Sequence, residues 1–557
     1  MGKTKPSMLI NMKRRQILPL AISSIAMLLA SCTGPANTES KDPGSDSALD
    51  PTSEVEGGER KILEASIKDP VIELDDTTKV VTNVEGCTFH SDDENIAEVD
   101  SKGNITGVEV GMARITVSKP GYFDKVLKVF VDEYDTIDYL VEGFEFGPAI
   151  VGVKINLENK VKASDLKGVE FNVKTNNSTR TVESVDLCDA EGFVTKDAES
   201  NYIRVSLAIS SNGYGANSNC SVFTYNNSTA INNWTPNIKA SVELKSGSTL
   251  VAGDVTYNDS HPLNISTIRS RIVLSTRDWG EAKSHTSDGY TLTYKGYEPE
   301  HLRADGVKNP LIIWLHGMGE GGIDPDIALL GNDVTELGNE KIQSHFVEGK
   351  QKGAYVLAAQ TPTMWMNSGS GSNNGGTGHS IYTKTLKALI DKFIEDNGDI
   401  DTNRIYVGGC SNGGYMTMEM AITYGNFFRA FYPCCEAYSD SFVEDSDIEK
   451  LKDLPMWFIH SKDDTTVNPD KFVIPTYQRL MRAGAKDVHF SFFTDVRGTQ
   501  GNPSGNKYMG HYSWIYIFRD EVEFDQEDPE DIQAPSDKEV KVNGKAVNLF
   551  DWMQAMK

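Results

Sequence analysis

The sequence predicts an α/β domain that is preceded by two β-sandwich domains. Between residues 61 and 275, short runs of β-branched residues alternate with turn signals, which is typical of sandwiches built from antiparallel strands. From residue 280 onward, apolar runs of strand length alternate with longer helical patterns, as expected of a largely parallel sheet covered on both faces. The 557 residues, 39% of them hydrophobic, supply enough apolar material for several separate cores.

The charge balance is strongly acidic, with 54 Lys and Arg against 80 Asp and Glu and a formal net charge of −26 at pH 7. A nucleic-acid binder needs a basic surface that displaces counterions from phosphates, and the only basic run is Lys13, Arg14 and Arg15. We therefore expect no nucleic-acid partner.

Residues 1–31 have the pattern of a signal peptide. Basic residues without any acidic one precede an apolar stretch from Ile17 to Ala30, which is too short for a bilayer that takes about 20 residues per crossing. The segment 29–32, Leu-Ala-Ser-Cys, resembles the lipobox of bacterial lipoproteins. This resemblance implies a lipid on Cys32 that anchors the protein in the cell envelope, on the periplasmic or the cell-surface face. An ordinary secretory signal is the alternative.

Residues 32–60 are rich in Ser, Pro, Gly, Asp and Glu and are predicted to be a flexible tether. The six cysteines beyond Cys32 have no spacing typical of a zinc or redox site, so we expect neither a metal nor a cofactor. An exported location permits disulfides, and Cys188 with Cys220 is the one pair that we suggest. Whether Cys434 and Cys435 form disulfides is left open.

The first sandwich is predicted over residues 61–133. Its segment 91–111, with the sequence SDDENIAEVD followed by GNITGV, resembles a bacterial Ig-like domain of group 2. Such a module implies a spacer or stalk without a binding role of its own.

The second sandwich is predicted over residues 134–275. Its layout resembles the Ig-like domain that precedes the catalytic domain in some bacterial esterases. Tyr214, Tyr225 and Trp234 lie in polar surroundings. This placement suits either a carbohydrate-facing surface or, more commonly, ordinary core and edge positions.

The α/β domain, residues 280–557, contains a candidate nucleophile at Ser411. The sequence 409–413, Gly-Cys-Ser-Asn-Gly, lies between a predicted strand, 404–407, and a predicted helix, 415–423, which is the context that G-x-S-x-G requires. The turn forces the serine into a strained backbone conformation, and side chains at 409 and 413 would collide with their surroundings. Cys410 is interpreted as a packed small residue, because G-x-C-x-G would need glycine where Asn412 stands.

A serine hydroxyl needs an imidazole to accept its proton, and the imidazole needs a carboxylate to orient it. Asp464 follows the predicted strand 455–459 in a segment, HSKDDTTV, that resembles H-G-x-x-D-x-x-V; Asp463 is the alternative acid. Of the two histidines that follow, His511 lies in a glycine-rich loop and is the candidate base, whereas His489 falls within a predicted strand and suits a structural role.

Two backbone N–H groups are predicted to stabilise the oxyanion that forms when a carbonyl is attacked. One belongs to Asn412, the residue after the nucleophile. The other belongs to Met318, in the segment 315–322, LHGMGEGG, which resembles the H-G-x-G oxyanion loop. No clustered His and carboxylate spacing suggests a catalytic metal.

With these motifs, residues 288–552 resemble the α/β-hydrolase superfamily, and within it the exported bacterial esterases related to polyhydroxybutyrate depolymerases and feruloyl or acetyl-xylan esterases. The acidic segment 521–537 departs from that pattern. The resemblance implies a serine-dependent carboxylic ester hydrolase that acts outside the cytoplasm, through an acyl-enzyme, on carbohydrate-linked or small acyl esters.

Two other functions are alternatives to this hydrolase on the same sequence features. A serine peptidase of the prolyl oligopeptidase type has the same triad, but the region before the α/β domain suits two sandwiches better than a β-propeller. A catalytically inactive binding lipoprotein would lack a triad member, and the sequence supplies all three.

Overall fold

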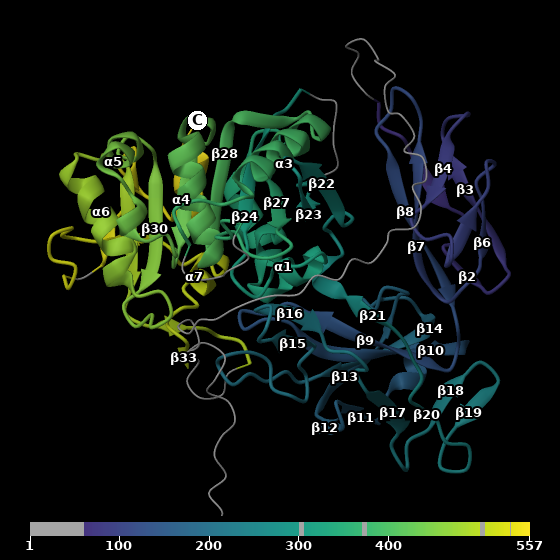
Figure 1. Cartoon of the computed structure of the whole chain (residues 1–557). Helices are drawn as coiled ribbons and strands as arrows, with labels where there is room; N and C mark the ends of the chain where they lie inside the picture. The colour runs from purple at the N-terminus through teal and green to yellow at the C-terminus, as the bar shows by residue number, and fades with distance from the viewer. Residues whose placement is uncertain (1–60, 300–305, 370–375, 502–506, 535, 557) are drawn as a thin grey trace, which may run out of the picture. The chain divides into compact units, whose positions relative to one another are not determined.

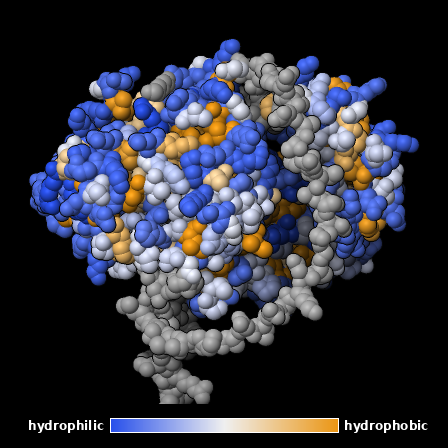
Figure 2. Space-filling view, turned by 45° about the horizontal axis from the view of Figure 1, so that its top comes forward, coloured by the Kyte–Doolittle hydropathy of each residue, from blue (hydrophilic) through white to orange (hydrophobic). Residues whose placement is uncertain are grey.

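The computed structural model describes residues 61–299, 306–369, 376–501, 507–534 and 536–556 (Figure 1). The predicted signal peptide, Cys32 and the tether lie outside the described residues. None of the helices in the described ranges is long and apolar enough to cross a membrane. Figure 2 shows hydrophilic residues over most of the face in view, with hydrophobic ones scattered among them.

The first β domain consists of two four-stranded sheets, with strand orders β1-β3-β6-β5 and β2-β8-β7-β4. Ala113, Ile115 and Val117 of β7 are fully buried and alternate with less buried residues, as the two-residue period of a strand requires. They share one core with apolar residues of the other sheet, such as Ile105. The strands are β1 (Ala65–Ile67), β2 (Val71–Glu73), β3 (Thr77–Thr82), β4 (Thr88–Ser91), β5 (Ala97–Val99), β6 (Asn104–Gly107), β7 (Gly111–Ser118) and β8 (Lys125–Asp132).

The second β domain has a seven-stranded sheet, formed by β9, β10, β13, β14, β18, β19 and β21, and a four-stranded sheet, β12-β11-β17-β20. A separate hairpin, β15–β16, projects from it. The strands are β9 (Thr136–Glu142), β10 (Ala149–Lys162), β11 (Phe171–Thr175), β12 (Ser178–Arg180), β13 (Val182–Cys188), β14 (Glu199–Leu207), β15 (Phe223–Asn226), β16 (Ile231–Trp234), β17 (Ala240–Leu244), β18 (Leu250–Ala252), β19 (Val255–Tyr257), β20 (Asn264–Ile265) and β21 (Ile268–Val273).

The suggested disulfide between Cys188 and Cys220 is wrong. Both are free, buried cysteines. Cys188 ends β13 opposite Tyr202 of β14, whereas Cys220 belongs to a core cluster that also contains Phe146 and Ala149 but not Cys188. The two thiols therefore belong to different parts of the domain.

The α/β domain is built on an eight-stranded sheet of order β22-β23-β27-β24-β28-β29-β30-β31. The pairs β22–β23 and β23–β27 are antiparallel, and the pairs from β27 to β31 are parallel. The strands are β22 (Lys283–Ser287), β23 (Tyr290–Tyr297), β24 (Asn309–Leu315), β27 (Tyr355–Gln360), β28 (Ile400–Cys410), β29 (Ala430–Cys434), β30 (Met456–Ser461) and β31 (Val488–Phe493).

Helices cover both faces of this sheet, and the central strand β24 shows how. Ile313 and Leu315 pack into a core with residues of α3, α4, α5 and α6, whereas Ile312 and Trp314 pack into a second core with residues of α1, α7 and α8. Burial on both faces explains the continuous apolar runs of the parallel strands. The helices are α1 (Pro325–Gly331), α2 (Glu340–Gln343), α3 (Thr383–Asp396), α4 (Asn412–Tyr424), α5 (Asp445–Leu451), α6 (Val473–Arg482), α7 (Trp514–Phe518) and α8 (Leu549–Ala555).

Short two-stranded pairs complete the domain outside the main sheet. They are β25 (Val347–Glu348) with β26 (Gln351–Lys352), β32 (Val496–Arg497) with β33 (Lys507–Tyr508), β34 (Phe524–Asp525) with β35 (Lys538–Glu539), and β36 (Lys541–Val542) with β37 (Lys545–Ala546). The parallel strands all end at one edge of the sheet, and in open α/β sheets ligands bind at that edge.

Candidate active site

Ser411 lies at the turn between the carboxyl end of β28 and the start of α4, with φ 54° and ψ −110°. This is a left-handed φ that a side-chain-bearing residue rarely adopts, and such strain is concentrated at functional sites. A Cβ on Gly413 would lie 1.8 Å from the carbonyl oxygen of Leu315, and a Cβ on Gly409 2.4 Å from the same oxygen. The glycines therefore let the turn pack directly against the end of β24.

Cys410, just before the serine, is fully buried. Its Sγ lies 3.4 Å from Oδ1 of Asn332. Burial raises the pKa of the Cys410 thiol well above its ordinary value, with the carboxyl of Glu320 adding to the effect. The thiol form is therefore maintained, whereas a cysteine nucleophile reacts as the thiolate.

Asp464 follows β30 and accepts four hydrogen bonds. Its Oδ1 accepts from the backbone N–H groups of Thr466, at 2.8 Å, and Val467, at 2.9 Å. Its Oδ2 accepts from Nδ1 of His511, at 2.7 Å, and from Nε2 of His460, at 3.1 Å. Burial alone would raise the pKa of Asp464, but the charge of His511 and the hydrogen bonds from both imidazoles hold it well below its ordinary value. The carboxylate is thus fixed and ionised beside His511.

The two alternative residues of the sequence analysis have other partners. The carboxylate of Asp463 accepts from Oγ of Ser461, at 2.6 Å, and lies 3.2 Å from Nζ of Lys507. His489 lies between two carboxylates, 3.0 Å from Asp525 and 3.1 Å from Asp487. The structure thus places Asp464, and not Asp463, against His511, and it gives His489 a structural role.

The end of β29 links the turn at Ser411 to the segment that follows His511. The backbone N–H of Ser411 donates to the carbonyl of Cys434, at 2.9 Å, and Sγ of Cys434 lies 3.4 Å from Oγ of Ser513, two residues after the histidine. Because Nδ1 of His511 donates to Asp464, the tautomer is set and Nε2 is the nitrogen left to accept a proton. The two loops and the elbow therefore meet at one edge of the sheet.

The loop after β24 carries Met318, and the peptide group before Met318 is anchored. Buried His316 accepts at Nε2 from the N–H of Thr361, at 3.1 Å, so that its Nδ1–H donates to the carbonyl of Gly317, at 2.7 Å. Burial lowers the pKa of His316 to about 4, and the ring is therefore neutral near pH 7. Since C=O and N–H point in opposite directions in a trans peptide, fixing the Gly317 carbonyl also directs the N–H of Met318.

Asn412, which begins α4, carries the other predicted donor. Its side-chain Oδ1 accepts from the backbone N–H of Trp365, at 2.6 Å. This bond holds the first residue of the helix against the loop after β27. Trp365 itself is fully buried.

Sequence reasoning missed several supporting residues. His460 belongs to the quoted acid motif, which was the available signal, but its bond to Asp464 was not anticipated. Asn332, whose Oδ1 lies 3.5 Å from the backbone N of Gly317, and Asn232, in the second β domain, have no recognisable sequence signal. Their roles depend on which segments the fold brings together.

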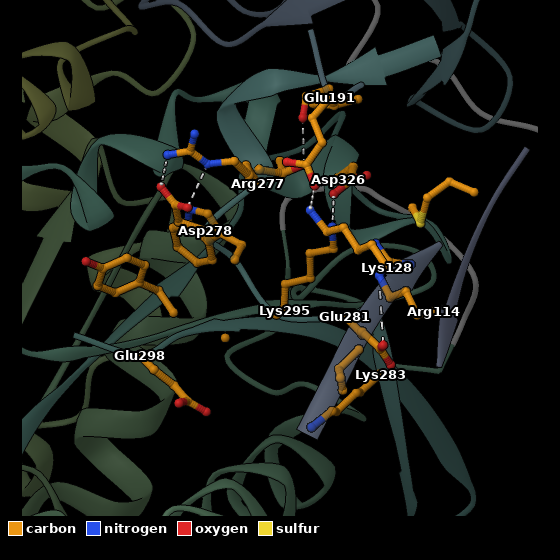
Figure 3. Close-up of a pocket in the computed structure, with 18 of the residues that line it drawn as sticks. Arg114, Lys128, Glu191, Arg277, Asp278, Glu281, Lys283, Lys295, Glu298 and Asp326 are labelled. Carbon is orange, nitrogen blue, oxygen red and sulfur yellow. Dashed lines mark hydrogen bonds and ion pairs between the residues drawn. The ribbon is translucent and has the colours of Figure 1, made fainter. Parts of the chain in front are cut away.

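A separate hollow of about 1300 Å³ is lined by residues of all three domains (Figure 3). Several of its charged side chains form pairs, such as Lys128 with Glu191 at 2.8 Å and Lys295 with Asp326 at 2.5 Å. Because these charges already neutralise each other, we assign it no ligand. Within the described ranges, no group of three or more His, Cys, Asp and Glu residues has an arrangement that could hold a metal ion.

Comparison with known proteins assigns all three folded regions. Residues 302–499 match the phospholipase/carboxylesterase family, residues 136–257 the esterase Ig-like N-terminal domain, and residues 72–129 the bacterial Ig-like domain of group 2. The chain is 26% identical over 174 residues to the "Probable carboxylesterase SOBER1-like" of Arabidopsis thaliana. That match covers 29% of this chain and 63% of the relative, so the chain spans less than two thirds of its length.

Among solved structures, a thermostable esterase aligns with a TM-score of 0.54 and 21% identity, over 69% of this chain and 96% of that one. This likeness extends over more of the chain than the α/β domain alone. At 21% identity, this likeness supports the assignment of the fold. The chain therefore contains a domain of the phospholipase/carboxylesterase family, preceded by an esterase Ig-like domain and a group 2 bacterial Ig-like domain, and the prediction of a serine esterase of the α/β-hydrolase superfamily is confirmed at the level of the family.

Proposed function

We propose that the protein hydrolyses carboxylic esters with Ser411 as nucleophile, His511 as base and Asp464 as the acid of the triad. The hydrogen bond of 2.7 Å between Asp464 and His511 carries this proposal, because it leaves Nε2 of the imidazole as the proton acceptor. The strained turn at Ser411 presents the hydroxyl at the same edge of the sheet.

In the first step, Oγ of Ser411 attacks the ester carbonyl carbon while its proton passes to Nε2 of His511. The N–H groups of Asn412 and Met318 stabilise the resulting oxyanion, and one such donor is worth about 2.7 to 4 kcal/mol. Collapse of the tetrahedral intermediate releases the alcohol, which takes the proton from His511. Water then attacks the acyl carbon and gives a proton to Nε2 of His511. The second intermediate breaks its bond to Oγ of Ser411, which takes that proton back, and the carboxylic acid is released.

We further propose that the substrates are carbohydrate-linked or small acyl esters outside the cytoplasm, with Cys32 as the lipid anchor. Tyr214 supports a substrate surface beside the site, since this residue is 66% exposed and its carbonyl accepts from the hydroxyl of Tyr512, at 3.1 Å. Tyr512 directly follows His511. An exposed aromatic ring of this kind suits stacking against a sugar or an aromatic acyl group.

The test compares p-nitrophenyl acetate and methyl ferulate with aminoacyl-prolyl amides. We expect the wild type to cleave the esters, Ser411→Ala to lose this activity, and the control Ser439→Ala, whose hydroxyl contacts Ser441, to keep it. Ester cleavage that survives Ser411→Ala would refute the nucleophile. Faster cleavage of the amides would instead favour the peptidase.

Location is tested by fractionation. We expect the full chain in the membrane fraction and Cys32→Ala in the soluble one. Equal membrane association of both proteins would refute the anchor and leave the esterase proposal untouched.

A further inference from the structure

The hairpin β15–β16 of the second β domain contacts the loop that carries Met318. The backbone N–H of Asn232 donates to the carbonyl of Gly319, at 2.6 Å. The side-chain amide of Asn232 donates to the carboxyl of Glu320, at 3.4 Å. Further along the loop, Nε1 of Trp234 donates to Asp324, at 2.7 Å. The hairpin thus bonds to three residues of a segment that belongs to another domain.

Glu320 is buried, and its carboxyl fills space beneath the loop. A Cβ on Gly317 would lie 3.1 Å from its Oε2, and a Cβ on Gly331 2.4 Å from its Cγ. Asn232 is the only side-chain donor to this carboxyl in the described part of the chain. Burial raises the pKa of Glu320 to about 8, although the hydrogen bond from Asn232 acts in the opposite direction. Cys410, Tyr225 and Tyr512 are the other titratable groups that face it.

The loop needs such support because glycines flank Met318. Gly319 has φ +114°, in a region open mainly to glycine, and Gly317 also lacks a side chain that would restrict it. His316 holds the peptide before Met318 from inside the α/β domain. The hairpin holds the carbonyl of Gly319, two residues beyond that of Gly317, from the second β domain. His316 fixes the peptide that carries the N–H of Met318, and the contacts from the hairpin limit the movement of the residues that follow it.

We infer that the side chain of Asn232 is a positioning group for the oxyanion loop, through its bond to Glu320 beside the backbone bond of the same residue to Gly319, so that the second β domain completes the active site. This inference rests on the proposed function, in which Met318 supplies an oxyanion donor. An oxyanion donor acts mainly in the transition state, so its misplacement lowers kcat and leaves KM nearly unchanged.

The test measures kcat and KM for p-nitrophenyl acetate with the full chain. Asn232→Ala removes the bond to Glu320 and keeps the backbone N–H on Gly319. We expect its kcat to fall about tenfold with KM within about twofold, since loss of a whole oxyanion donor costs about 100- to 1000-fold and here the donor is only loosened. The matched control is Asn233→Ala, on the same strand, where the exposed side chain bonds only to the carbonyl of Ile231. We expect Asn233→Ala to have the same kcat as the wild type.

Asn232→Leu is the second variant, because it keeps the size of the side chain but has no hydrogen-bonding group for Glu320. We expect its kcat to fall at least as far as that of Asn232→Ala. A kcat within about twofold of wild type in both variants would overturn the inference, and so would an equal loss in Asn233→Ala. Activity that persists in Ser411→Ala would instead refute the proposed function itself.

Discussion

Replacing Glu320 with glutamine is expected to stabilise the protein at neutral and alkaline pH but not at acid pH. The substitution keeps the shape of the side chain and its hydrogen-bonding capacity toward Asn232, while it removes the proton equilibrium. Glu320 is 5% exposed, so in the folded state water cannot solvate its ionised carboxylate well, and ionisation is unfavourable. An unfolded chain imposes no such restriction.

The size of the effect follows from the two pKa values. Burial raises the pKa of Glu320 from an ordinary 4.5 to about 8. Below pH 4.5 the group is protonated in both states and contributes no difference. Between pH 4.5 and 8 the unfolded chain releases the proton and the folded protein keeps it, so stability is lost as the pH rises. At about 1.36 kcal/mol for each pH unit, the loss approaches about 5 kcal/mol by pH 8.

Urea unfolding at pH 4.5, 6.5 and 8.5, followed by tryptophan fluorescence, measures this difference. We expect the unfolding free energy of Glu320→Gln to exceed that of the wild type by an amount near zero at pH 4.5 that grows to several kcal/mol at pH 8.5. The exposed Glu340→Gln serves as control and should follow the wild type throughout. A Glu320→Gln advantage that is independent of pH would refute the reasoning.

Three further predictions concern the same domain. Gly413→Ala should abolish esterase activity or soluble expression, since its Cβ would lie 1.8 Å from the carbonyl oxygen of Leu315, whereas Gly398→Ala, in open space, should preserve both. His345, with a pKa raised to about 9 by its carboxylate partners despite burial, should lend stability that is full below about pH 6.5 and lost through pH 9. His345→Gln should flatten that part of the stability profile. Activity assayed with EDTA should match the untreated enzyme.

The parts that the sequence predicted well are those governed by neighbouring residues. Burial on both faces of β24 produces an apolar run that can be read directly, and the glycines around Ser411 reflect a local steric requirement. The order of acid and histidine led to Asp464 and His511, which the structure brings within 2.7 Å. Their catalytic roles stay a prediction until Ser411→Ala is assayed.

The parts that the sequence did not predict depend on contacts between distant segments. Asn232 and Glu320 are 88 positions apart and belong to different domains, so no periodicity or motif connects them. The suggested pair of Cys188 and Cys220 failed for the same reason, because spacing along the chain says nothing about which sheet a thiol packs against. His460 was visible in the motif, but its bond to Asp464 depends on the turn after β30.

Two buried groups support the loop around Met318, and their pKa values lie far apart: about 4 for His316 and about 8 for Glu320. With a pKa of about 4, His316 remains neutral above that pH and keeps donating to Gly317, so this anchor does not change as the solution becomes mildly acidic. Loss of activity on the acid side is therefore not expected to come from this anchor. On the alkaline side, ionised Glu320 would place a negative charge beneath the loop that receives the oxyanion. We expect kcat of the wild type to fall above about pH 8 for this reason. Glu320→Gln should keep its kcat there, and an identical decline in both proteins would assign the alkaline loss to another group.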